Sequence, residues 1–92
     1  MEQITEQTII NAIVALDVAK LKELSSALKD ERHGLCATKF IKVRAIGALS
    51  AAGLTEYPEV KTLSSEIEEI DNKLDRLCTL HDYVTRAIKN LE

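Results

Sequence analysis

The sequence predicts an all-α protein, a small up-down-up three-helix bundle with a long C-terminal helix, pinned by one zinc site. Its apolar residues are nearly all Leu, Ile, Val and Ala, with 3% aromatic residues and no Trp, a composition that favours helices. Gly occurs three times and Pro once, so few positions suit the turns of β-hairpins. A chain of 92 residues fits one domain with a modest core.

The first helix is expected over about residues 4–30. Apolar residues recur at helical spacing, among them Ile10, Ile13, Leu21 and Leu24. In the first half of this range they surround the whole circumference, so we expect the helix to contact more than one neighbour.

The second helix is expected over about residues 35–52. Cys36, Phe40, Val43 and Gly47 fall on one stripe of it, which we interpret as a core-facing stripe. Gly53 follows directly and is expected to cap the C-terminal end.

The third helix is expected over about residues 58–91 and has the clearest periodicity. Pro58 suits a first helical turn, and Glu56 and Glu59 suit the positive end of the helix dipole. Apolar residues and one His then follow at alternating spacings of three and four, the a/d pattern of a helix-packing seam: Val60, Leu63, Ile67, Ile70, Leu74, Leu77, His81, Val84, Ile88 and Leu91.

Two short connections, at residues 32–34 and 53–57, make consecutive helices antiparallel neighbours. If the second and third helices fold back about Tyr57, two pairs of scarce residues come level with each other. These pairs are His33 with Cys36, and Cys78 with His81.

These four residues are the only His and Cys of the chain, and each pair has two residues between its members. A Cys2His2 set fills the tetrahedron of zinc and leaves no position for water or substrate. The sequence therefore predicts a structural Zn²⁺ site at His33, Cys36, Cys78 and His81. The alternative is that Cys36 is an ordinary core residue and that His81 only sets helix register.

Several classes of function are disfavoured by the sequence. With both His committed to zinc there is no general base of convenient pKa, and there is no phosphate-binding loop, so we do not expect an enzyme. No run of apolar residues is long enough to span a membrane. The acidic start of the chain lacks the pattern of a signal peptide, so we expect a cytoplasmic protein.

The expected helix lengths suggest where a partner binds. The third helix would continue beyond the other two, and Val84, Ile88 and Leu91 would then have no cover within the chain. We predict that these three residues and Tyr83 bind a larger protein partner, or a second copy. The protein would be an adaptor, regulator or inhibitor, comparable in size to proteins that phages and mobile elements use against host enzymes.

Two alternatives stay open. The basic segment Lys29 to Arg44 could contact nucleic acid, with Arg32, Lys39, Lys42 and Arg44 as possible phosphate contacts. The charge distribution also allows a plainer account, in which these cations face the carboxylates of the next helix. Alternatively, paired terminal helices could make the protein a homodimeric coiled-coil spacer.

Overall fold

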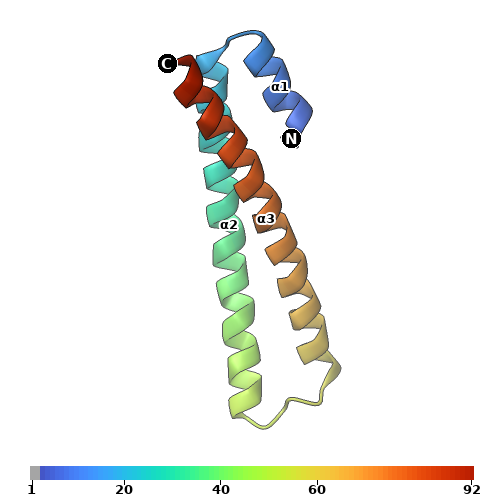
Figure 1. Cartoon of the computed structure of the whole chain (residues 1–92). Coiled ribbons are helices and arrows are strands. Elements are labelled where there is room, and N and C mark those ends of the chain that lie inside the picture. Colours follow the sequence, from blue (N-terminus) through green and yellow to red (C-terminus); the bar gives the residue numbers. More distant parts are fainter. Residues whose placement is uncertain (1–2) are drawn as a thin grey trace.

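The computed structural model describes residues 3–92, and this part of the chain contains three helices and no strand. The helices are α1 (Glu6–Val14), α2 (Val18–Ala51) and α3 (Pro58–Leu91). The predicted all-α class is confirmed. In Figure 1, α2 and α3 run antiparallel as one long hairpin, and α1 lies beside the end of the hairpin where the chain terminates. The molecule measures 56 × 21 × 18 Å.

The prediction of one helix over residues 4–30 is wrong, because the chain turns at residues 15–17. Leu16 adopts a left-handed conformation with φ of 55°. The Leu16 N–H donates to the Ile13 carbonyl, and the Asp17 N–H donates to the Ala12 carbonyl. These two bonds form a Schellman motif, which usually has Gly where this chain has Leu.

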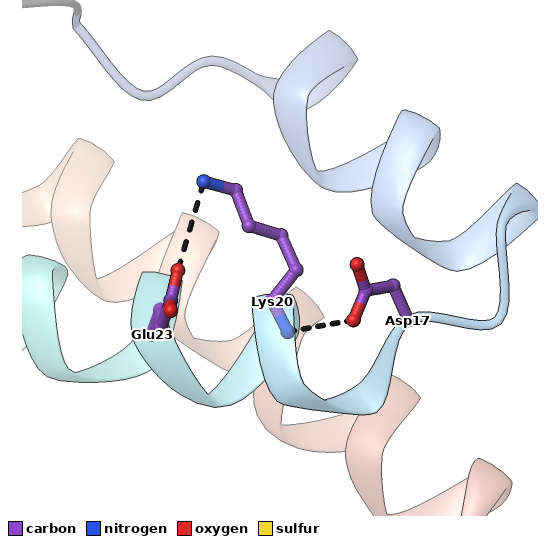
Figure 2. Close-up of polar contacts among 3 residues, drawn as sticks. All are labelled: Asp17, Lys20 and Glu23. Atoms are coloured by element: carbon purple, nitrogen blue, oxygen red, sulfur yellow. Dashed lines mark hydrogen bonds and ion pairs between the residues drawn. The ribbon is translucent and has the colours of Figure 1, made fainter.

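Asp17 starts the next helix. Its carboxylate accepts a hydrogen bond of 3.0 Å from the Lys20 N–H, as Figure 2 shows, and so satisfies one of the free donors at the N-terminus of α2. Lys20 in turn lies 3.8 Å from the carboxylate of Glu23 on the exposed side of the helix. This ion pair is exposed and adds little stability.

The predicted connection at residues 32–34 is also wrong, since α2 continues through His33 and Gly34 without a break. Gly34 has no positive φ, and helical hydrogen bonding carries through it because the flanking residues favour helix. The first turn of the chain therefore lies about seventeen residues before the predicted one. As a result, the fold is a two-helix hairpin with a short added helix and not a bundle of three comparable helices.

The second connection and α3 agree with prediction. Gly53 has φ of 80° and follows the C-cap residue Ala52. The Gly53 N–H donates to the Ser50 carbonyl, and the Leu54 N–H donates to the Leu49 carbonyl, which completes a second Schellman motif. Pro58 occupies the first turn of α3, whose bounds are those expected.

The cluster of buried side chains lies at the end of the hairpin that α1 covers, and Ile70 is buried outside this cluster. The members of the cluster come from all three helices: Ile9, Ala12, Leu21, Leu24, Leu28, Leu77, Leu80 and Val84. Along α2, the residues facing α3 repeat at spacings of four and three, and every one is buried or half-buried: Leu21, Ser25, Leu28, Arg32, Leu35, Lys39, Lys42, Ile46 and Leu49. The hairpin is therefore an antiparallel coiled coil with an a/d seam on both helices.

Replacing Leu16 by Gly is expected to stabilise the fold. The left-handed conformation costs a residue with a side chain more than it costs Gly, and Leu16 is 69% exposed, so little packing is lost. We expect a gain of about 0.5 to 1 kcal/mol in the free energy of unfolding, measured by urea denaturation. Ala15→Gly is the control and should destabilise, because Ala15 has a right-handed helical conformation. A loss of stability in Leu16→Gly would contradict the turn at this position.

Replacing Gly34 by Ala tests the continuity of α2. A Cβ at Gly34 would meet no atom within 4 Å, so Ala should add about 0.5 to 1 kcal/mol through its higher helix propensity. Gly53→Ala has the same open space but a positive φ, and should cost about 1 kcal/mol. Thermal melts followed by circular dichroism measure both. Destabilisation by Gly34→Ala would instead indicate a bend at residues 32–34.

Candidate protein-interaction surface

The four predicted zinc ligands lie on two helices but do not form one cluster. His33, Cys36 and Cys78 are exposed, and His81 is half-buried. Nε2 of His81 lies 3.2 Å from Oγ of Ser25, within hydrogen-bond distance. Among residues 3–92 there is no group of three or more His, Cys, Asp or Glu side chains arranged to hold a metal ion.

The reason is the register of the hairpin. Because Ser25 lies beside His81 and the helices are antiparallel, Cys78 lies level with residues near Leu28. The ion pairs of Lys39 with Asp71 and of Lys42 with Glu66 give a register within four residues of this one. His33 and Cys36 therefore lie four to eight residues, or about 6 to 12 Å along the axis, beyond the positions level with His81 and Cys78. The expectation that the two pairs lie level is therefore wrong. Each pair keeps two donors on one helix face, and a four-ligand zinc site stays a prediction.

The predicted partner-binding tail is largely covered within the chain. Val84 is fully buried, and Ile88 and Leu91 are half-buried against the same core. Of the four predicted residues only Tyr83 is exposed. The prediction is wrong for Val84, Ile88 and Leu91 because α2 begins at Val18 and α1 folds back, so that both helices cover the end of α3.

The predicted phosphate contacts have carboxylate partners inside the hairpin. Nζ of Lys39 lies 2.5 Å from Oδ1 of Asp71, and Lys42 pairs with Glu66. Arg32 is half-buried on the α2 seam, and the guanidinium of Arg44 lies 5.7 Å from the centre of the Phe40 ring. Two of the four cations are thus largely neutralised by α3, which agrees with the intramolecular account of the charge pattern.

Lys39 is held in its charged form by this arrangement. The hydrogen bond to Asp71 is the main reason that the pKa of Lys39 is raised above its ordinary value of 10.5, and the charges of Asp71, Cys36 and Asp75 act in the same direction. Partial loss of hydration opposes them. At neutral pH this seam position therefore carries a full positive charge opposite a carboxylate.

The part of the hairpin beyond α1, which we call the distal hairpin (residues 32–71), has almost no buried side chain. No residue between Leu28 and Ile70 is buried. Large apolar side chains are nevertheless present and exposed: Phe40 (61%), Ile41 (68%), Val43 (47%), Leu54 (39%) and Tyr57 (56%). Two helices alone can cover only the seam between them, so the flanking apolar residues face water.

Sequence reasoning placed the stripe Cys36, Phe40, Val43 and Gly47 in the core, and this is wrong. All four residues are exposed, because the adjacent stripe of Leu35, Lys39, Lys42, Ile46 and Leu49 faces α3. The signal that could have identified the correct stripe was its four-three spacing, which continues that of Leu21, Ser25 and Leu28. Its polar members made it look like a solvated face.

A groove of about 970 Å³ marks where α1 stops covering the hairpin. Leu24, Ala27, Glu31 and Leu35 line it from α2, with Lys73 and Leu77 from α3. Cys36, Phe40 and Val43 lie on the opposite flank of α2, about 100° or more around the helix from the residues that line the groove. The exposed stripe therefore lies on the side of the hairpin away from α1.

Comparisons with known proteins give no family and no relative: no family model, no curated protein and no solved structure matches the chain. Over residues 3–92, no helix combines the length and the apolar character that crossing a bilayer requires.

The raised pKa of Lys39 can be tested by NMR titration of its side chain. Asp71→Asn should lower the pKa of Lys39, since it removes the charge that accepts the hydrogen bond, whereas Asp75→Asn should lower it less. Because the folded-state pKa lies above the unfolded value, the ion pair stabilises the fold below about pH 10.5. This stabilisation is lost as the pH rises through the folded-state pKa. Equal pKa values in the parent and in Asp71→Asn would contradict the pairing.

Proposed function

We propose that this chain is a small helical protein-interaction module, acting as an adaptor, regulator or inhibitor, and that the distal hairpin is its docking surface. One observation supports this most directly: α2 contributes no buried residue beyond Leu28, yet carries the exposed Phe40 and Val43 on one flank of that stretch. Exposed apolar side chains gathered on one element are typical of surfaces that associate with another protein.

The partner would supply helices or another apolar face. An antiparallel helix pair offers a groove on each side of its seam, and a further helix that enters such a groove covers residues of both helices. On the side away from α1, the exposed stripe of Cys36, Phe40 and Val43 lies on the same flank of the hairpin as the half-buried Ile67 and Leu74 of α3. These residues would become the apolar centre of the interface.

The pairing of Lys39 and Lys42 with carboxylates favours a protein partner over nucleic acid. A phosphate backbone attracts cations that stand free of acidic neighbours, and α3 brings Asp71 and Glu66 directly to these two lysines. A protein surface, in contrast, can match regions of both signs on the same hairpin.

Affinity capture with matched variants tests the proposal. Val43→Glu should abolish capture of the partner, since it places a charge in the apolar contact, whereas Ile41→Glu should retain it. Both side chains are exposed on α2, but they lie about 160° apart around the helix. The measurement is quantitative mass spectrometry of proteins cross-linked to the tagged chain in its native cells, the chain itself included.

Two outcomes would contradict the proposed docking surface. One is the same captured set from Val43→Glu as from the parent. The other is a nucleic acid that binds the purified chain with an affinity that falls steeply with salt, while no protein depends on Val43.

A further inference from the structure

We propose that the occupant of this surface is a second copy of the chain, and that two distal hairpins form a symmetric four-helix bundle in which α2 of each copy packs on α3 of the other. This inference rests on the proposed docking surface and names its partner. The argument for a second copy comes from the charge pattern of the distal hairpin.

The two halves of the distal hairpin carry opposite charge. Residues 32–55 contain four cationic side chains and no carboxylate, whereas residues 56–71 contain six carboxylates and one cation. The ion pairs of Lys39 with Asp71 and of Lys42 with Glu66 use only part of this charge. Within residues 3–92, Arg32 and Arg44 form no ion pair, and neither do the remaining carboxylates: Glu56, Glu59, Glu68 and Glu69.

A surface that is positive along one helix and negative along the next is complementary to itself. A two-fold rotation about an axis parallel to the hairpin places α2 of one copy over α3 of the other, with the two helices antiparallel. Positive and negative regions then meet twice, once on each side of the axis. A rotation about an axis across the hairpin would instead place α2 on α2 and α3 on α3, where charges of like sign meet.

The apolar residues fit the same arrangement. Phe40 and Val43 would face the partner copy's α3, where Ile67 and Leu74 are half-buried at the edge of the seam. Both pairs of helices would then enclose these residues from four sides, as in the core of a four-helix bundle. In this arrangement α1 does not obstruct the contact between the two copies, since it lies on the opposite side of each hairpin.

Arg44 gives the arrangement a specific ionic contact. Lys42 pairs with Glu66, so the level of Arg44 on α3 lies within about one to two helical turns of Glu68. A two-fold axis along the hairpin preserves levels, so Glu68 of the second copy lies close to the level of Arg44. Arg44 and Glu68 are both exposed, and an exposed ion pair sets orientation more than affinity.

Sedimentation equilibrium of the purified full chain over a range of concentrations tests the dimer. We expect a dimer in the parent, a dissociation constant raised at least about tenfold in Val43→Glu, and no comparable change in Ile41→Glu. Far-ultraviolet circular dichroism confirms that each variant keeps its helices. A monomer at all concentrations would overturn the inference, and so would equal weakening by the two variants.

Charge reversal tests the pairing of α2 with the other copy's α3. Arg44→Glu should weaken the dimer, and adding Glu68→Arg should restore it, with the effect shrinking at high salt. Equal weakening in the single and the double variant would overturn this pairing.

Cross-linking tests the direction of the two hairpins. Leu54→Cys, in a background of Cys36→Ser and Cys78→Ser, places one thiol in each hairpin turn. If the turns lie at the same end of the bundle, oxidation should give a disulfide-linked dimer. Tyr83→Cys, near the other end of α3, is the matched substitution. If the two hairpins ran in opposite directions, its thiol would link to that of Leu54→Cys in a second copy. Links between these two positions, with none between the turns, would overturn the proposed direction.

Failure of the inference and failure of the proposed function give different results. A chain that is monomeric when pure, but captures a protein through Val43, has the docking surface and a different occupant. A chain that is monomeric and captures nothing through Val43 has neither the proposed docking surface nor the proposed dimer.

Discussion

The structure depends on one geometrical constraint, which is that two packed helices can cover each other along a single seam only. Over the first part of α2, the short helix α1 adds a third apolar surface to the two that meet at the seam. The three helices together close a core around Leu24, Leu28 and Leu77. Beyond α1 the same two helices continue for several turns without a third element. There the seam residues are half-buried at best, apart from Ile70, and the apolar residues beside the seam are exposed.

The composition of the seam follows this change in surroundings. Near α1 its positions on α2 include Leu21 and Leu28, which are 0% and 1% exposed. Further along they include Lys39 and Lys42, whose long aliphatic stems can lie on the neighbouring helix while the charged ends reach Asp71 and Glu66 at the edge. Lysine is tolerated at these positions because the seam there is open to solvent on both sides.

The helical class, the bounds of α3 and the Gly53 turn could be predicted, because periodic apolar spacing, Pro58 and Gly53 are local signals. The turn at residues 15–17 could not, since Leu16 adopts a conformation that sequence rules assign to Gly. Gly34 led to the opposite error, a predicted break where the helix continues. The free-energy cost of one Gly inside a strong helical pattern is smaller than the cost of interrupting the helical hydrogen bonds. These two errors left Val84, Ile88 and Leu91 without cover in the predicted fold. The predicted zinc site depended instead on folding the hairpin about Tyr57, whereas the contacts of Ser25 with His81 and of Lys39 with Asp71 centre the fold-back at residues 53–55.

The position of the core has a consequence for the way the chain folds. The hairpin turn at Gly53 lies at the end of the molecule farthest from the core (Figure 1), and Leu21 and Val84 meet only after the long segment between them has been closed into a loop. Contacts that form first near the turn are solvated and weak, while the contacts that stabilise the chain join distant residues, and closing so long a loop costs more entropy than closing a short one. Folding therefore has to cross its entropic barrier before most of the stabilising burial is gained, and backbone amides near the turn should exchange with solvent through local opening that leaves the core intact.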